Sequence, residues 1–599
     1  MHVKFATLLA FALLAAASPG PAPALAERAS FARMFCHFMI GIESDRTSSA
    51  DYDADMQRAK SYGIDAFALN IVCPALLLWR FVFLFLVCAP VDEWAFAQSI
   101  HTLTNSSAAN NGMQVFISYD FNWWNTGQGA QIGAHMAQYA SLPAQLHING
   151  AAFVSSFAGD GVDVAAMRAA AGIDIMFVPN FHPGVGDFSL IDGALNWMAW
   201  PNNGNNKAPD GSGNVTVAQG DASYQQALAG KPYLAPASAW FSTHYGPEVS
   251  YSKNWVFPSD LLWFTRWTQL LELAPPFIEI VTWNDYGESH YVGPLGSKHQ
   301  DDGASKWAND MPHDTWLDMA KPFIAAYHAG ATSVNSFITQ DQIIYWYECT
   351  VRHFLLLTVT PPTRQPTPPA NNASGNYFEG RPDGWQSMSD SVFVVTLLKS
   401  PGDLTVNSGG NTQTFKNVPA GASSFEVPMA VGQQSFALAR NGVNVLAAVS
   451  LKDISSVCPC GIYNFNAYTG SIPASFVDQM GPDGLNSLVA GLHVSTCSPT
   501  PSLPTSAPPY TGPGGTGTAP PTSSTVTSPP TSSTSSTVTG PTSTPTSSTI
   551  TTPPVSSTTS VSGSCTITAS SQIFPTNCLQ PGCVWAGPAG DDPPDHCDG

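Results

Sequence analysis

Two carboxylic acids stand three positions apart in the segment EIVTWNDYGESHYVGPL, residues 279–295. Asp285 and Glu288 follow an apolar run, and Gly287 between them permits a sharp turn. Hydrolysis of a glycosidic bond needs two carboxyl groups, because one protonates the leaving oxygen while the other activates water or attacks the anomeric carbon. The segment therefore predicts Asp285 and Glu288 as a catalytic pair, although Asp-x-x-Glu is by itself a common spacing.

Neighbouring side chains in the same segment suit the binding of a sugar. Trp283 and Tyr286 can stack on sugar rings, and Asn284 and His290 can hydrogen-bond to hydroxyl groups. This context adds weight to the two acids, because it supplies both apolar ring faces and polar groups around them.

Eight short apolar stretches alternate with polar or helical ones, which indicates strands that are each followed by a helix. The predicted strands are 33–41, 65–71, 114–121, 151–157, 174–181, 194–201, 232–241 and 277–284. Segments such as Ala54–Gly63 and Val162–Ala171 have helical spacing and end at or just before a glycine. Eight strand–helix units predict a (β/α)8 TIM-type barrel as a catalytic domain over residues 30–330.

Polar and aromatic residues gather near the carboxyl ends of these strands, which is where such barrels form their active sites. The polar set, with His37 in mid-strand, is His37, Asn70, Asp120, Asn180, Trp200, His244 and Asp285. Five tryptophans fall in the same places: Trp123, Trp124, Trp197, Trp200 and Trp240. Any one polar residue is explained more simply as the point where a strand ends. Together they favour a sugar-binding cleft.

The chain after the barrel changes composition three times. Residues 331–375 are expected to be a connector, and residues 376–497 a second domain that ends in a cysteine-bounded segment. Between 389 and 450 apolar and polar residues alternate around Gly- and Asn-rich turns, which predicts a small antiparallel β-sandwich. Residues 498–563 are almost wholly Ser, Thr, Pro and Gly and read as an O-glycosylated linker. Residues 564–599 form a short Cys-rich tail.

The N-terminus predicts export. Lys4, the apolar run Phe5–Ala17 and the small residues Ala24-Leu25-Ala26 are typical of a signal peptide over residues 1–26. The apolar run is too short for a membrane span. Three glycosylation sequons agree with a secretory route, at Asn105, Asn214 and Asn372. We therefore expect a secreted protein, extracellular or associated with a cell wall.

The charge of the chain bears on its partners, and its cysteines bear on its disulfides. A net charge of −20 and a pI of about 4.9 leave no cationic surface for phosphates, so nucleic acid is not an expected partner. Seven of the eleven cysteines lie after residue 457 and indicate disulfides in an exported chain, whereas Cys36, Cys73, Cys88 and Cys349 are expected to be mostly unpaired. No metal-ligand cluster or nucleotide motif is found, so we expect no cofactor. We also expect the protein to be a monomer.

Two stretches do not fit this organisation. VCPALLLWRFVFLFLVCAP, residues 72–90, interrupts the barrel after its second predicted strand, and VRHFLLLTVTPPTRQ, residues 351–365, follows a regular strand pattern. Both begin with Val, whose codons start with GT, the usual 5′ boundary of an intron. We interpret both as intron sequence retained in the coding sequence; the alternatives are a genuine insertion or, least favoured, a membrane segment.

Several long motifs resemble the fungal α-1,3-glucanases, or mutanases, of glycoside hydrolase family 71. They include GIDAFALNI, VFISYDFNWW, SYSKNWVFPSDLLWFTRW and IEIVTWNDYGESHYVGPL, and the resemblance runs from about Phe35 to Ala320 and more loosely to Cys497. It implies a (β/α)8 catalytic domain, cleavage of (1→3)-α-D-glucosidic linkages and an inverting mechanism. We expect endo-acting cleavage, although the sequence itself does not distinguish endo from exo action. The expected partner is then α-1,3-glucan.

The resemblance also implies roles for individual residues. The WNDYGE motif gives Asp285 and Glu288 as the catalytic pair, without saying which is the acid and which the base. Asp120 is a reserve or supporting carboxylate, with a capping role as the alternative. Substrate-binding candidates, besides the residues around the acids, are His37, Trp123, Trp124, Asn180, Trp200, His244, Tyr245 and Asp302. For each tryptophan the alternative is packing beneath the rim.

The sequence departs from the family pattern at two positions. The apolar stretch 72–90 replaces a polar segment after the second strand, and Ala158 stands where relatives tend to have Glu. These departures leave a second hypothesis open, a catalytically impaired protein that binds cell-wall glucan. A third hypothesis is a glycosidase for another linkage, because only the resemblance identifies the anomeric configuration.

Overall fold

The computed structural model describes the chain in thirteen ranges: 32–42, 46–71, 92–204, 206–211, 213–245, 253–295, 308, 310–351, 382–456, 464–474, 506–512, 566–568 and 584–586. For 92–100, 244–245 and the last two ranges only the backbone is described. The predicted signal peptide, the stretch 72–90, residues 352–365, Asp302 and most of the linker and tail lie outside these ranges. Within them, no helix is long and apolar enough to cross a membrane.

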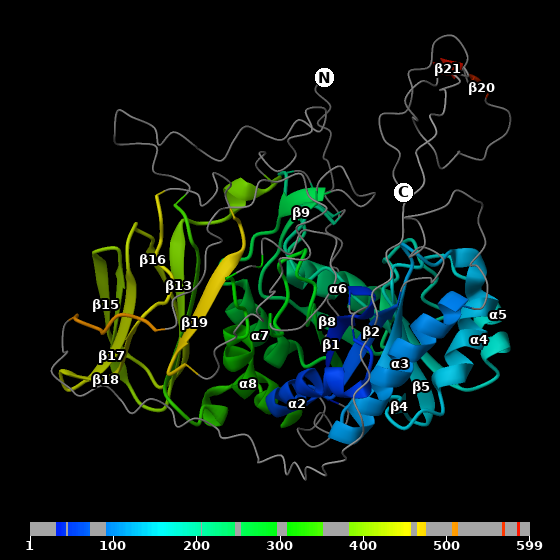
Figure 1. The fold of residues 1–599 in the computed structure, drawn as a ribbon, viewed down its shortest axis with the longest axis horizontal. Helices are drawn as coiled ribbons and strands as arrows, with labels where there is room; N and C mark the ends of the chain where they lie inside the picture. Colours follow the sequence, from blue (N-terminus) through cyan, green and yellow to red (C-terminus); the bar gives the residue numbers. More distant parts are fainter. Residues whose placement is uncertain are drawn as a thin grey trace, which may run out of the picture. The chain divides into compact units, whose positions relative to one another are not determined.

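A curled sheet of parallel strands forms the centre of the first domain (Figure 1). All eight predicted strands are present: β1 (Arg33–Met39), β2 (Ala66–Ile71), β3 (Gln114–Asp120), β5 (Ala151–Phe157), β6 (Ile175–Pro179), β7 (Ala194–Leu195), β8 (Tyr233–Ala237) and β11 (Phe277–Ile280). Each strand pairs with the next along the chain, except β6 with β7, and β11 returns to pair with β1. A short strand β4 (His147–Ile148) pairs antiparallel with β5. This pairing is compatible with the predicted TIM-type barrel.

Helices follow seven of the eight strands: α2 (Asp53–Tyr62), α3 (Asp92–Asn111), α4 (Gly129–Tyr139), α5 (Val164–Ala171), α6 (Val217–Leu228), α7 (Leu262–Leu273) and α8 (Thr315–His328). Helices α2 and α5 confirm the predicted segments, because they end at Gly63 and Gly172 in the left-handed conformation that glycine allows. The connection from β6 to β7, which is fully described, has no helix, so the prediction of eight strand–helix units is wrong there. Short 3-10 helices are η1 (Ile40–Ile42), η2 (Ser49–Tyr52), η4 (Thr126–Gln128), η6 (Asn335–Phe337) and η9 (Trp385–Ser387).

Strand β7 ends six residues before the predicted limit at residue 201 because a side chain turns the backbone. The Asn196 carbonyl oxygen Oδ1 accepts a hydrogen bond from the Met198 backbone N–H at 3.0 Å, and the Ala199 N–H donates to the Trp197 carbonyl at 2.8 Å. Local bonds of this kind compete with sheet ladders, and here they replace the ladder with a turn.

Four phenylalanines close the inside of the curled sheet. Phe35, Phe116, Phe153 and Phe277 come from different strands, and their ring centroids lie 4.8–5.7 Å apart. All four are buried. This aromatic layer forms a floor, so polar side chains that follow it along each strand lie between the floor and the carboxyl-terminal edge.

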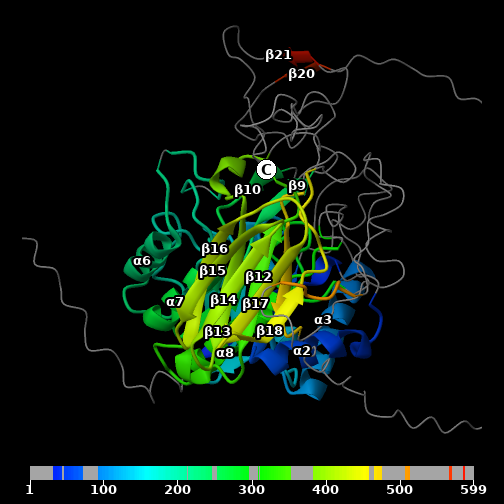
Figure 2. The same ribbon diagram turned by 90° about the vertical axis from the view of Figure 1, so that its left-hand side faces the viewer.

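Two four-stranded antiparallel sheets form the predicted β-sandwich (Figure 2). Their strands are β12 (Gln342–Glu348), β13 (Ser391–Leu398), β14 (Gly402–Ser408), β15 (Asn411–Val418), β16 (Gly421–Pro428), β17 (Gln434–Arg440), β18 (Val443–Val449) and β19 (Ala467–Ile472). The sheets meet through one apolar cluster, in which Tyr345 stacks on Phe436 with ring centroids 4.0 Å apart. Strand β12 lies in the range predicted as a connector, yet it pairs with both β13 and β19.

The sandwich packs against the first domain through the other face of its inner sheet. Trp346 of β12 lies in the same apolar cluster as Trp316 of α8, and its indole nitrogen donates to the Asp260 carbonyl at 2.8 Å. The Asp260 carboxylate in turn accepts hydrogen bonds from the backbone and hydroxyl of Ser389, at 3.1 and 2.8 Å. The two domains therefore share one continuous buried core.

The remaining described structure adds little to this arrangement. Cys36 and Cys349 are free and buried, which confirms the prediction for these two cysteines. In the separate unit formed by residues 523–599, β20 (Thr566–Thr568) and β21 (Val584–Ala586) pair in parallel.

Candidate active site

The loop after β11 folds back on itself and presents the two predicted catalytic acids. The Thr282 N–H donates to the His290 carbonyl and the Val292 N–H donates to the Thr282 carbonyl, both at 3.0 Å. Ser289, which completes the turn, has a positive φ of 59°. Because β11 is a central strand of the sheet, this fold-back places Asp285 and Glu288 at its carboxyl-terminal edge.

The side chains of Asp285, Glu288 and His290 lie close together in this loop. Nε2 of His290 lies 2.7 Å from Oε2 of Glu288 and 3.7 Å from Oδ2 of Asp285. The Glu288 backbone N–H donates to Oδ1 of Asp285 at 3.2 Å. The carboxylates are 15% and 12% exposed, so both remain within reach of a substrate.

A lysine that sequence reasoning missed completes this cluster. Nζ of Lys253 forms an ion pair with Oε1 of Glu288, so each oxygen of the Glu288 carboxylate has its own partner. Lys253 begins β10 (Lys253–Val256), which pairs antiparallel with β9 (Ser242–Tyr245) in the connection after β8. Lys253 is the only cationic residue in the motif SYSKNW, which resembles the family, but the motif does not indicate which residue the lysine pairs with.

Burial and hydrogen bonds favour one neutral tautomer of His290. Burial lowers its pKa to about 4, against an opposing effect of the Asp285 charge. With its proton on Nε2, the ring donates to Glu288, and Nδ1 accepts from the Thr282 hydroxyl at 3.1 Å. The Thr282 oxygen also accepts from the Asp285 backbone N–H at 3.0 Å, so one hydroxyl links the histidine to the loop. Trp200 and Phe241 enclose the ring, with centroids 5.4 and 5.6 Å away.

The residues just before Asp285 are hydrogen-bonded to other parts of the first domain. Asn284 is buried, and its side chain forms two hydrogen bonds with the Met39 backbone, at 2.8 and 3.2 Å. The Trp283 indole nitrogen donates to Oδ1 of Asp55 at 2.9 Å, and Asp55 also pairs with Arg46 at 2.6 Å. Both side chains were predicted to bind substrate; here their polar atoms hold the loop in place.

A buried polar layer lies inside the sheet, above the phenylalanine floor. Nδ1 of His37 lies 2.7 Å from Oε1 of Glu279, and both side chains are inaccessible to solvent. Asp120, at the end of β3, accepts hydrogen bonds from the Asn122 N–H at 2.9 Å and from Asn70 at 3.4 Å. Burial raises the pKa of Asp120, and its hydrogen bonds oppose this. Glu279 was not predicted, although a charge at an inward strand position was a signal for it.

Comparison with known proteins identifies the family of this chain. The profile of glycosyl hydrolase family 71 matches residues 31–481, which is most of the chain and includes every residue of the cluster. The chain belongs to glycosyl hydrolase family 71. A Penicillium rubens protein named mutanase is 39% identical over 457 residues, which cover 76% of this chain and 90% of the relative.

Two relatives from Schizosaccharomyces pombe extend the comparison. A glucan endo-1,3-alpha-glucosidase is 32% identical over 72% of this chain and 93% of its own length. An ascus wall endo-1,3-alpha-glucanase is 26% identical over 73% of this chain and 96% of its own length. The family match therefore covers the first domain and the sandwich together rather than one of them.

The other residues that were predicted to bind substrate differ in how far they are buried. Trp124, Asn180 and Trp200 are buried, and their nitrogens donate within the chain to Ile71 O, Leu195 O and Trp240 O at 3.1–3.2 Å. Trp123 is half-buried and remains the more accessible stacking candidate. His244 and Tyr245 lie on β9, where the backbone alone is described, and Asp302 lies outside the described residues.

Ala158, where relatives tend to have Glu, directly follows β5. It has a left-handed backbone with a φ of 52°, and its N–H donates to Oδ1 of Asn180 at 3.4 Å. An Ala in this conformation is unfavourable by about 1–2 kcal/mol, so the surrounding bonds impose it.

Asp285, Glu288 and His290 are also the group of described residues whose donor atoms are close enough to hold a metal ion, within 4.8 Å of one another. The Lys253 ammonium already occupies one Glu288 oxygen, and a neighbouring cation repels a metal ion. The arrangement thus suits acid–base chemistry better than metal binding.

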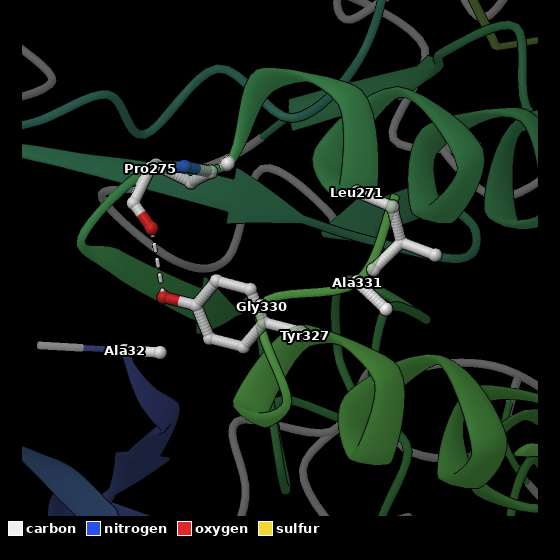
Figure 3. A pocket seen from close by; sticks show the side chains of 7 residues that line it. Ala32, Leu271, Pro275, Tyr327, Gly330 and Ala331 are labelled. Carbon is white, nitrogen blue, oxygen red and sulfur yellow. Dashed lines mark hydrogen bonds between the residues drawn. The ribbon is translucent and has the colours of Figure 1, made fainter. Parts of the chain in front are cut away.

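A small pocket of about 10 Å³ lies at the opposite, amino-terminal end of the strands (Figure 3). Tyr327 donates there to the Pro275 carbonyl at 2.9 Å, and Leu271 and Ala331 complete the apolar wall. Its size and position exclude it as the substrate site.

Proposed function

We propose that this chain hydrolyses (1→3)-α-D-glucosidic linkages in α-1,3-glucan, with Asp285 and Glu288 as the catalytic pair at the open end of a (β/α)8 barrel. The observation that carries the proposal is the convergence of both carboxylates with His290 at the end of β11, in a chain whose family match spans both domains. The named activities of the relatives supply the linkage and the endo mode of action.

Inversion at the anomeric carbon is part of the proposal through the family resemblance, and the spacing of the acids makes it worth measuring. One oxygen of Asp285 and one of Glu288 lie within 4.8 Å. Inverting pairs usually stand about 6.5–9.5 Å apart, and retaining pairs about 5–5.5 Å. Proton NMR of the first product formed from a soluble α-1,3-glucan decides between them, because inversion yields the β-anomer.

Secretion and a monomeric state complete the proposal. The leader-like residues 1–26 and the three sequons support export, and the net charge of −20 suits a neutral polysaccharide. The predicted products are short α-1,3-linked oligosaccharides released outside the cell or within its wall.

The test measures reducing ends released by the purified full chain from α-1,3-glucan and, in parallel, from β-1,3-glucan. We expect release from the first alone, and a loss of about 10³-fold or more in Asp285→Asn and Glu288→Gln. Binding to insoluble α-1,3-glucan without release would instead support the impaired glucan-binding protein. Release from β-1,3-glucan would overturn the linkage.

A further inference from the structure

One β-hairpin holds Glu288 through both its backbone and its side chain. The Ser242 N–H, on β9, donates to the Glu288 carbonyl at 3.1 Å, and Lys253, on β10, forms the ion pair with the carboxylate. The two strands pair in register, with Lys253 opposite Tyr245 and Val256 opposite Ser242. The hairpin therefore fixes where the lysine stands relative to the catalytic loop.

The outer strand of this hairpin is itself fixed by the chain that leads into the sandwich. The Val256 N–H donates to the Asp383 carbonyl at 2.9 Å, and the Asp383 N–H donates to the Asn254 carbonyl at 3.0 Å. A Cβ on Gly384 would lie 2.6 Å from the Val256 carbonyl oxygen, so only glycine allows this approach. The ion pair is thus a built feature rather than a meeting of two free surface side chains.

The charges around Glu288 differ on its two sides. Lys253 is 24% exposed and faces Oε1; neutral His290 faces Oε2, and Asp285 lies beside the same histidine. Lys253 also acts electrostatically on Asp120 of β3. A carboxylate whose two oxygens meet an ammonium and an N–H donor is stabilised in its ionised form.

We propose that Lys253 is a positioning residue that holds Glu288 ionised and oriented, which assigns the base role to Glu288 and the acid role to Asp285. The inference rests on the proposed function and deepens it. In the single displacement of an inverting reaction, Glu288 removes a proton from the attacking water, whose oxygen bonds to the anomeric carbon. The bond from that carbon to the leaving glycosidic oxygen breaks, and Asp285 gives its proton to that oxygen. Glu288 thus gains one proton and Asp285 loses one.

The experiment compares Lys253→Met and Lys253→Arg with the wild-type chain on α-1,3-glucan, measuring kcat, KM and the pH profile of kcat/KM. Lys416→Met is the matched control, because it removes a lysine–carboxylate pair with Asp403 on the exposed sandwich surface. Circular dichroism and thermal unfolding of each variant establish that it is folded.

We expect kcat of Lys253→Met to fall about 10- to 100-fold, with a much smaller change in KM. The acidic limb of its pH profile should move to higher pH by about 1 unit, because a base that loses its neighbouring cation is protonated more easily. Lys253→Arg should restore kcat to within about 5-fold of wild type and return the limb, since a guanidinium also pairs with a carboxylate. Lys416→Met should match the wild type.

Three outcomes overturn the inference. They are an unchanged kcat in folded Lys253→Met, a loss confined to KM, and a loss of kcat without movement of the acidic limb. Glu288→Gln separates the two levels of the argument. If the wild type is active and Glu288→Gln retains that activity, the proposed pair is wrong; if Glu288→Gln is inactive and Lys253→Met is not impaired, the lysine assignment alone is wrong.

Discussion

Asp55 of α2 accepts a hydrogen bond from the indole nitrogen of Trp283 at 2.9 Å, although 228 positions separate the two residues in the chain. The other oxygen of Asp55 pairs with Arg46, whose guanidinium lies over the Tyr52 ring at 4.7 Å. Trp283 stands two residues before Asp285, so this contact joins helix α2 to the loop that carries the candidate acids.

Asp55→Ala should therefore weaken both the fold and the activity. It removes the carboxylate that pairs with the buried Arg46 guanidinium at 2.6 Å, which costs about 3–5 kcal/mol in the free energy of unfolding. Asp55→Asn should cost less, because an amide oxygen still accepts from Trp283. Urea denaturation and kcat on α-1,3-glucan check this, with Asp187→Ala in an exposed loop as the control. Equal stability of the alanine and asparagine variants would contradict the argument.

A second buried ion pair joins two barrel helices. Arg266 of α7 binds both carboxylate oxygens of Asp221 of α6, at 2.5 and 2.9 Å, and its Nε donates to the Pro236 carbonyl at 2.8 Å. Tyr233 donates to the same carboxylate at 2.6 Å. All these groups are buried, so each depends on the others for its hydrogen bonds.

Arg266→Met should lower the free energy of unfolding by about 3–5 kcal/mol, because it strands a buried carboxylate. The double variant Arg266→Met with Asp221→Leu should recover part of this loss, since it removes both charges. Chemical denaturation of the two variants provides the measurement. A double variant no more stable than the single one would show that packing, and not the stranded charge, dominates.

The strands of this fold could be predicted because each is a short apolar run bounded by polar residues. The end of β7 could not be predicted. There a hydrogen bond to the Asn196 side chain replaces the hydrogen bonds between strands, and no residue pattern indicates this change. Strand β12 lies in the range 331–375, which was predicted as a connector. Only its pairing with β13 and β19 shows which domain it completes.

The candidate site likewise has residues that could be predicted from the sequence and residues that could not. The sequence could place three residues close together, because only five positions separate the first from the last: Asp285, Glu288 and His290. Lys253 could not be placed with them, because it reaches Glu288 through a hairpin 35 positions earlier whose direction the sequence does not state. Burial also gives two residues a role other than the predicted one. Asn284 and Trp283 were predicted to bind sugar, but their polar side-chain atoms form hydrogen bonds within the chain.

Asp120 is expected to support the site rather than to replace either acid. Asp120→Asn keeps an oxygen that can accept from the Asn122 N–H, and it resembles the protonated form that burial favours. We expect kcat to fall about 10-fold or less, against about 10³-fold for Glu288→Gln. Parallel assays of both variants on α-1,3-glucan check this. A loss in Asp120→Asn as large as that in Glu288→Gln would make Asp120 a member of the catalytic pair.

Four buried histidines should make the protein less stable in acid. Burial lowers the pKa of His101 and His313 to about 3 and of His135 and His290 to about 4. In the unfolded chain a histidine has a pKa of about 6.5, so below that pH the unfolded state binds more protons than the folded state. The stability that each neutral histidine provides is complete above pH 6.5 and is lost as the pH falls toward its folded value.

His101 offers the cleanest test of this dependence. Within the part of the chain that the structure describes, neither of its buried ring nitrogens has a hydrogen-bond partner, and its ring meets Tyr139 edge-on with centroids 4.1 Å apart. His101→Phe keeps an aromatic ring but removes the titrating group. Relative to wild type, its free energy of unfolding should gain about 2 kcal/mol between pH 6.5 and pH 5, at about 1.4 kcal/mol per pH unit. Urea denaturation at pH 7, 6 and 5 measures the difference, and parallel curves for the two proteins would show that His101 takes up no proton on unfolding.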